Sequence, residues 1–516
     1  MLSVRLRIVV TCVVLLVAAA GAWRLLPSGG AEKVITVGTT DAVTSLDPAG
    51  AYDAGSWALY SNVFQSLLTF RPGAATPVPD AAERCAFTGL NLQTYSCELR
   101  DDLTFSNGHR ISAEDVKYSF ERMLRITTDV GPKSLFTTLA SVTAEGRTVT
   151  FHLRNRDATF PQKVATGAGS IVDRSAYPAN GLRTGGTVDG SGPYVLKEYV
   201  PGVSATLEPN PTYKGAITKR GGPVVVRYFK ESAQLAAAWK RKDVDVTHRQ
   251  MPPSVITGIV NGTSAVRVDA ADSSEVRDLV FNVREDSPFA KVAVRKAVAA
   301  AVDRSALATS VYRATVEPLY SLIPQGITGH STSFFNAYPK PDPGRARRLL
   351  EETGVAAPVR FTLAHRDDSA AAAEAAELRR QLQGTGAFEV TVVSVPWQAL
   401  QKGYAAGKYD AFTIGWVPDF PDPDNFVQPL VGHDSTLHSG YRSARVERLI
   451  QSTQQYSERG RAAKDFRSIQ DVVADDVPLV PLWQKKDYVL SSEDVAGAQY
   501  LSDGTGIWRL WELGWL

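Results

Sequence analysis

In the first half of the chain, hydrophobic and polar positions alternate over short stretches, which indicates β-strands. The segments 31–40 and 148–153 alternate in this way. Two other stretches carry apolar residues at helical spacing: 52–68, and a segment that begins at the N-cap Ser112 and runs to about residue 124. The first half therefore predicts short strands interrupted by these two helices.

The second half alternates buried strands with longer helices. A short apolar strand at 279–283 precedes an Ala/Val helix at 291–302, and the strands 359–364 and 390–395 flank a helix at 369–383. Strands that alternate with helices of this length form a parallel or mixed sheet covered on both faces. The pattern predicts an α/β fold.

Composition narrows the class of protein. The chain has 516 residues, 44% hydrophobic and 21% charged, and its 56 Lys and Arg nearly balance its 54 Asp and Glu. At about 100–200 residues per domain, this length predicts two large lobes or several domains, and the apolar content excludes global disorder. A net charge of +2 gives no basis for nucleic-acid binding, which needs a concentrated basic surface.

The N-terminus has the features of an export signal. Arg5 and Arg7 precede an uncharged apolar run at 8–22 that ends in Ala-Gly-Ala. The run is shorter than the ~20 residues of a membrane span, although apolar residues at 23–26 extend it past one Arg. We expect 1–30 to be a cleaved signal peptide or a retained anchor, which places the mature protein at the outer face of the cytoplasmic membrane, in the periplasm or outside the cell.

Beyond this segment the chain has two cysteines, Cys85 and Cys97, twelve residues apart. An even number in an exported chain favours a disulfide, and the residues between them are typical of a hairpin. The alternative is a pair of unrelated buried thiols. Neither arrangement predicts a metal site, because the chain has no CxxC.

The sequence argues against an enzyme. It contains no GxSxG, HExxH, GxxxxGK[ST] or GxGxxG motif, and its seven histidines are scattered. His433 and His438 lie close together in a loop, but no carboxylate pattern marks them as ligands. We therefore expect no metal, no cofactor and no hydrolase activity.

The most unusual local composition lies at 415–426, directly after an apolar strand at 411–414. Three prolines alternate there with three carboxylates, and Trp416 stands three residues before Asp419. Prolines stiffen a loop, and the carboxyl end of a strand is where open α/β sheets bind ligands. The segment is either a ligand site or a structural turn whose Asp side chains accept backbone N–H groups.

From this loop outward, the chain resembles the solute-binding proteins of peptide/nickel-type ABC transporters (extracellular solute-binding protein family 5). Single blocks are weak signals, but here they occur in the family's order over nearly the whole mature chain. The matching blocks are Ser45-Leu46-Asp47-Pro48, 99–108 with 112–116, Gly190-Ser191-Gly192-Pro193-Tyr194, Asn210-Pro211-Thr212-Tyr213, Phe281-Asn282, 294–297 and 301–304.

The resemblance implies a bilobal, periplasmic-binding-protein-like clamshell of type II, with the ligand enclosed between lobes joined by crossover strands. Lobe 1 is expected at 32–275, completed by 480–516, and lobe 2 at 276–479. The segments 279–283 and 478–483 are the candidate crossovers.

The resemblance also implies a ligand site. In the family's oligopeptide and dipeptide binders, the residue matched by Asp419 pairs with the ligand's α-ammonium group, and tryptophans matched by Trp416 and Trp397 line the chamber. Oligopeptide binders carry basic residues where this chain has Tyr404 and Thr413, so a clamp for the ligand's carboxylate is unsupported.

Two further acids of the loop, Asp422 and Asp424, are expected to brace it rather than touch the ligand. The implied function is a monomeric importer subunit that captures peptides for a membrane permease driven by a separate ATPase. Alternatives are another solute (a glycoside, another amine or a chelated metal), or a receptor that presents its ligand to a signalling partner.

Overall fold

The computed structural model describes residues 33–128, 131–218, 221–249, 251–260, 266–502 and 504–516, so the predicted signal or anchor at 1–30 lies outside the described residues. Ile35–Leu516 forms one compact unit. Within the described ranges, no helix combines the length and the apolar character that crossing a bilayer requires.

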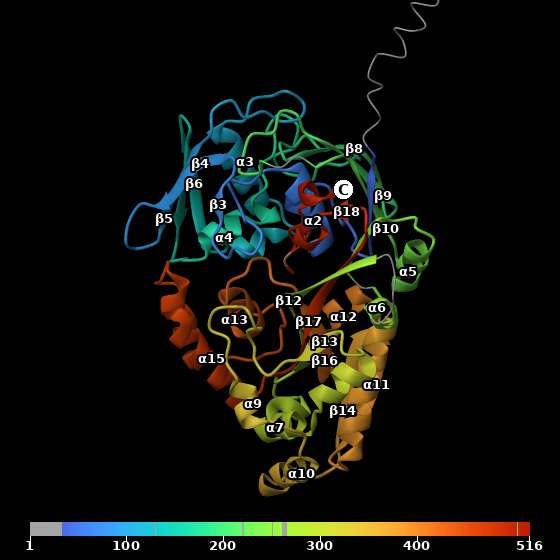
Figure 1. The fold of residues 1–516 in the computed structure, drawn as a ribbon. Helices are drawn as coiled ribbons and strands as arrows, with labels where there is room; N and C mark the ends of the chain where they lie inside the picture. The colour runs from blue at the N-terminus through green and yellow to red at the C-terminus, as the bar shows by residue number, and fades with distance from the viewer. Residues whose placement is uncertain (1–32, 129–130, 219–220, 250, 261–265, 503) are drawn as a thin grey trace, which may run out of the picture. The chain divides into compact units, whose positions relative to one another are not determined.

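An eleven-stranded mixed sheet runs through the described residues. Its two longest strands, β12 (Val266–Phe281) and β17 (Leu479–Ser492), pair antiparallel at its centre (Figure 1). Outward from β12 lie β16 (Ala411–Trp416), β14 (Val359–Arg366) and β15 (Phe388–Val395). Outward from β17 lie β11 (Val246–His248), β1 (Ile35–Thr39), β10 (Val224–Tyr228), β9 (Ser204–Pro209) and β8 (Tyr194–Val200), and β13 (Val316–Pro318) also pairs with β17.

The sheet confirms the predicted strand–helix alternation. β14 pairs in parallel with both β15 and β16, and β1 pairs in parallel with β10 and β11, whereas the other ladders are antiparallel. Parallel neighbours need a crossover, and α11 (Ser369–Gly384) supplies it between β14 and β15. The helix begins where the Asp368 carboxylate accepts the backbone N–H of Ala371, a side-chain N-cap.

The remaining α-helices pack on this sheet, on a second sheet described below, or beside them. They are α2 (Ala54–Val63), α3 (Ala113–Arg125), α4 (Phe160–Val164), α5 (Ser232–Lys240), α6 (Pro253–Val260), α7 (Val292–Ala301), α8 (Arg304–Ala306), α9 (Ser333–Ala337), α10 (Pro343–Glu352), α12 (Trp397–Ala405), α13 (Asp424–Val431), α14 (Ala444–Thr453) and α15 (Ala463–Asp476).

A separate antiparallel sheet carries the two cysteines. Its order is β4 (Ala82–Phe87), β5 (Thr94–Leu99), β7 (Thr148–Leu153) and β6 (Leu139–Glu145). Cys85 on β4 lies directly opposite Cys97 on β5, and the two form a disulfide. The predicted bridge and hairpin are therefore confirmed. Two short ladders pair β2 (Leu68–Thr69) with β3 (Val78–Pro79), and β18 (Val495–Ala496) with β19 (Gly514–Trp515).

Buried apolar side chains gather in two large clusters. The N-terminal core draws on Ile35–Val246 and on Val489–Leu513, and the central core on Val276–Trp483. Among the described residues of 276–483, Phe420 alone belongs to the N-terminal core. The lobe boundaries expected at 275/276 and 479/480 stay a prediction, which these two cores support.

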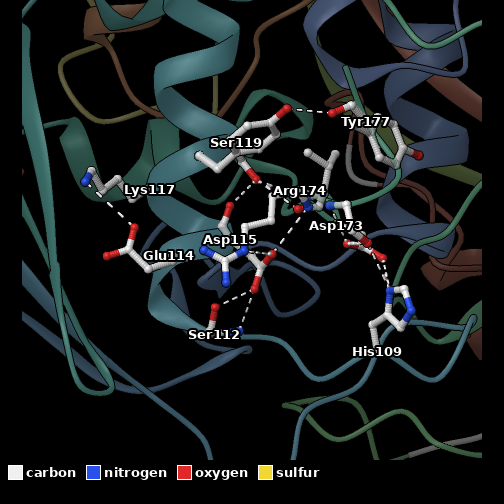
Figure 2. Close-up of polar contacts among 12 residues, drawn as sticks. His109, Ser112, Glu114, Asp115, Lys117, Ser119, Asp173, Arg174 and Tyr177 are labelled. Carbon is white, nitrogen blue, oxygen red and sulfur yellow. Dashed lines mark hydrogen bonds and ion pairs between the residues drawn. The ribbon is translucent and has the colours of Figure 1, made fainter. Parts of the chain in front are cut away.

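Polar contacts hold the segment around α3, as Figure 2 shows. The Asp115 carboxylate accepts the backbone N–H of Ser112 at 2.9 Å, which completes the capping box at the start of α3. His109 Nδ1 lies 2.7 Å from the Asp173 carboxylate, and Asn107 donates to the same oxygen. Ser112 is therefore an N-cap as predicted, and this block of the sequence organises a loop.

Candidate ligand-binding site

Strand β16 positions the candidate site. It lies between β14 and β12, and it ends at Trp416. Prolines at 418, 421 and 423 then restrict the backbone until α13 begins at Asp424. Because the strand is paired on both sides, the loop that follows starts from a fixed point.

Asp419 lies at a buried junction between the two cores. Its side-chain Oδ2 accepts a hydrogen bond from the hydroxyl of Tyr52 at 2.7 Å and another from Nδ2 of Asn425 at 3.0 Å. The Asn425 side chain also accepts the backbone N–H of Asp419 at 2.8 Å. Asp419 forms no ion pair with any described residue, so hydrogen bonds are the direct polar contacts of its carboxylate.

Burial changes the chemistry of this carboxyl. Asp419 is 7% exposed, and burial raises its pKa to about 6, although hydrogen bonds from Asn425 and Tyr52 and the more distant charge of Lys163 oppose the rise. The Tyr52 hydroxyl covers Oδ2 of this carboxylate.

The two candidate tryptophans are placed differently. Trp416 is half-buried, and its indole Nε1 donates to the backbone carbonyl of Asn425 at 2.7 Å, which links it to the residue that holds Asp419. Trp397, the first residue of α12, is 40% exposed. The described contacts join neither Trp416 nor Asp419 to Trp397.

The other two acids of the loop make the bracing contacts expected of them. Asp422 forms a two-point ion pair with Arg459, and its Oδ1 accepts the backbone N–H of Asp424. The Asp424 carboxylate accepts a hydrogen bond from Gln454 at 2.7 Å. The loop is thus a braced turn at Asp422 and Asp424, while Asp419 faces the opposite core.

An arginine side chain from the neighbouring strand β12 lies beside Thr413. Arg277 on β12 donates from Nη2 to the Thr413 hydroxyl at 2.9 Å and from Nε to the buried Glu374 carboxylate at 2.8 Å. Tyr404 stacks on Phe412 with ring centroids 4.6 Å apart. Position 413 therefore has a guanidinium beside it, but that guanidinium is already paired with a carboxylate.

Two residues of this junction were missed by sequence reasoning. Tyr52 lies 367 residues before Asp419, and the apolar spacing at 52–68 predicts it inside a helix, whereas α2 begins at Ala54. Asn425 lay inside the unusual loop, but only its neighbouring acids were singled out. No local signal identifies Tyr52, because its partner is brought to it by the tertiary fold.

One constellation resembles catalytic machinery in its residue types. Ser175 Oγ lies 3.1 Å from His109 Nδ1, and Asp173 contacts the same ring nitrogen. In a hydrolytic triad the serine and the carboxylate must occupy opposite ring nitrogens. This cluster cannot pass a proton from serine to histidine in that way, and His109 is 60% exposed. Within the described ranges, no group of three His, Cys, Asp or Glu side chains is placed to hold a metal ion.

Known proteins are similar to this chain in sequence and in fold. The dipeptide-binding protein of Pseudomonas aeruginosa is 24% identical over 86% of this chain and 87% of its own length. The structure of a dipeptide-binding protein from Pseudoalteromonas in complex with Met-Leu covers 94% of this chain and all of its own, with TM-score 0.80 and 18% identity. The Agrobacterium protein AgaA in complex with agropinic acid covers 94% of this chain and 99% of its own, also with TM-score 0.80, at 19% identity.

These structures confirm the predicted fold class, an α/β fold of the periplasmic-binding-protein type. The model of the bacterial extracellular solute-binding proteins, family 5 Middle, matches residues 76–437, which is well over half of the chain. Its range includes the β16 loop, Asp419 and both tryptophans. The chain therefore belongs to the bacterial extracellular solute-binding proteins of family 5.

Proposed function

We propose that this chain is the ligand-capturing subunit of an ABC importer, outside the cytoplasm, and that it holds a peptide by its α-ammonium group at Asp419. The observation that carries the proposal is a buried carboxylate without a cation within ion-pair distance among the described residues. A buried charge is costly unless it is paired, and a ligand ammonium supplies the missing partner.

The proposed mechanism is closure of two lobes around the ligand. Lobe 1 contains the N-terminal core and lobe 2 the central core, with β12 and β17 as the crossover strands. The ligand contacts both lobes in the closed state, and its preference for that state shifts the population towards it. The closed form then docks on a membrane permease that a separate ATPase drives.

The two tryptophans have separate parts in this proposal. Trp416 is held beside Asp419 through Asn425 and covers the apolar part of the ligand next to its amine. Trp397 is 40% exposed at the start of α12 and packs on the ligand from there. Asp422 and Asp424 keep their bracing contacts and do not touch the ligand.

The test uses calorimetry with the dipeptide Met-Leu and its N-acetylated form. Asp419→Asn keeps the size and both acceptor contacts of the side chain but removes its charge. We expect this variant to lose about 2–5 kcal/mol of binding free energy for Met-Leu, as when one partner of a buried charge pair is removed. Acetylation should weaken the wild type by a similar amount. If acetylation leaves the wild type unaffected, the ammonium anchor is wrong.

A second candidate is a non-peptide solute of the same importer class. The likeness in fold to a protein whose structure contains agropinic acid supports it. Mass spectrometry of the small molecules that co-purify with the protein separates the two candidates, since a peptide and a sugar or opine conjugate differ in fragmentation. A receptor role would appear as binding to a sensor domain in place of a permease.

A further inference from the structure

The hydroxyl of Tyr52 contacts the Asp419 carboxylate from the side of the N-terminal core. Tyr52 packs against the N-terminal core, whereas Asp419 follows β16, whose strand residues belong to the central core. Both protein donors to the carboxylate, Tyr52 and Asn425, use Oδ2. Oδ1 accepts no hydrogen bond from any described residue and is the oxygen left for a ligand.

We propose that Tyr52 is the second half of the ammonium site, and this rests on the proposed function. A tyrosine hydroxyl that donates its proton to Asp419 still has lone pairs with which to accept. An ammonium group carries several N–H donors. Tyr52 Oη is hydrogen-bonded to Oδ2, and Oδ1 is the other oxygen of the same carboxylate. In this proposal, a single ligand nitrogen donates to Tyr52 Oη and to Asp419 Oδ1 at once.

The tyrosine is held in place before any ligand arrives. Its ring stacks on Trp57 with centroids 5.2 Å apart, and the Trp57 indole donates to the carbonyl of Ala51 at 3.2 Å. Trp57 belongs to the buried N-terminal core. The hydroxyl therefore keeps its position without further ordering, which lowers the entropy lost on binding.

The pKa shifts of Tyr52 and Asp419 indicate which group donates the hydrogen bond and which accepts it. Burial and the negative charge of Asp419 raise the pKa of Tyr52 well above its usual value, so the hydroxyl stays protonated and donates to the carboxylate. The same hydrogen bond lowers the pKa of Asp419 against the larger effect of burial. Tyr52 thus favours the ionised carboxylate that a ligand ammonium needs.

The consequence is a ligand amine contacted from both cores. An amine bound to Asp419 alone would be held by the β16 loop, whereas one that also donates to Tyr52 ties that loop to the N-terminal core. A ligand without a charged amine gains neither contact. Tyr52 therefore selects for a free ammonium and makes that group favour closure.

The experiment removes one oxygen atom. Tyr52→Phe keeps the ring on Trp57, and we expect it to weaken Met-Leu binding at least about tenfold, the value of one hydrogen bond to a charged group. Binding of N-acetyl-Met-Leu should change less than about threefold. Tyr118→Phe is the matched control, because it removes a hydroxyl that donates to the backbone carbonyl of Tyr177, away from the site.

A second readout separates a ligand contact from a structural role. Without the Tyr52 hydroxyl, the pKa of Asp419 rises, so the acid limb of the Met-Leu affinity profile should move to higher pH. If Tyr52→Phe weakens both forms of the peptide equally, or leaves Met-Leu binding and the acid limb unchanged, the inference is wrong while the ammonium anchor stands. If acetylation is harmless to the wild type, or if Met-Leu does not bind it, both are overturned.

Discussion

The Asp47 carboxylate and the Arg122 guanidinium, 75 residues apart in the chain, form a two-point ion pair that solvent does not reach. Nη1 donates to Oδ1 at 2.8 Å and Nη2 to Oδ2 at 2.6 Å. Asp47 also accepts the backbone N–H groups of Ala49 and Arg183. The pair fastens the early loop of the chain to α3.

Removing the arginine should be strongly destabilising. Arg122→Met leaves the Asp47 charge buried without a cation, and we expect urea unfolding to report a loss of about 3–5 kcal/mol. Arg110→Met is the control, because its partner Asp102 and Arg110 itself are both exposed, and exposed pairs contribute little. Equal effects of the two substitutions would show that burial of the pair does not matter.

The disulfide should contribute to stability and not to binding. Replacing Cys85 and Cys97 together by Ser should lower the free energy of unfolding by about 2–4 kcal/mol, as expected for a loop of this size in the chain-entropy model. Met-Leu affinity should stay unchanged, because β4 and β5 contribute no residue to the Asp419 junction. Thiol titration of the unreduced, denatured mature protein should find no reactive thiol, and two reactive thiols would contradict the bridge.

Asp278 should make the folded protein less stable as pH rises. This residue of β12 is 1% exposed, and neither carboxyl oxygen has a hydrogen-bond partner among the described residues. Burial raises its pKa to about 8, although the charge of Arg277 opposes the rise. The folded state holds a proton that the unfolded chain releases near pH 4, so the stability contributed by this group is lost between about pH 4 and pH 8.

Asp278→Asn tests this dependence by removing the titrating group at constant size. We expect the variant to exceed the wild type by more than about 1 kcal/mol in unfolding free energy at pH 8, and the difference to shrink towards pH 5. Denaturant unfolding at several pH values measures it. Parallel curves for the two proteins would mean that Asp278 does not titrate in this range.

Peptide affinity should fall in acid. Burial raises the pKa of Asp419 to about 6, and the proposed ammonium ligand would favour the ionised carboxylate, so protons should compete with the ligand below that pH. We expect Met-Leu affinity to be level from about pH 6.5 to 7 and to weaken up to tenfold per pH unit below about 6. Calorimetry down to about pH 4.5 measures it, because both charges of the dipeptide persist over this range. Asp419→Asn should show no such acid limb.

Local pattern was enough to locate elements whose ends are set by nearby residues. Ser112 caps α3, Asp368 caps α11, and the strands on either side of α11 pair as expected. The predicted strand at 279–283 was too short, because β12 begins at Val266. The polar residues of β12, including Arg277 and Asp278, obscure the strand pattern in the sequence. Pairing with β17 stabilises this strand more than its own composition does.

The sequence blocks that carry the resemblance are mostly structural in this chain. Asp47 is buried against Arg122, Asp115 accepts the backbone N–H of the N-cap Ser112, and Arg295 donates to the backbone carbonyl of Asp476. Such blocks identify a fold because the fold needs them. The proposed site depends instead on Tyr52 and Asp419, whose contact joins residues 367 positions apart and leaves no periodic pattern in the sequence.

The burial of Phe420 anchors the loop after β16 in the N-terminal core. Its side chain, 1% exposed, sits in the N-terminal core, only four residues after Trp416 at the end of a central-core strand. An opening motion that withdraws Phe420 exposes a large apolar side chain, at a cost of about 1.5–3 kcal/mol. A motion that leaves it buried must be absorbed by backbone rotation between residues 416 and 420, where Pro418 removes one of the free torsions. Separation of the two cores at this loop therefore has to overcome the burial of Phe420 as well as the hydrogen bond between Tyr52 and Asp419.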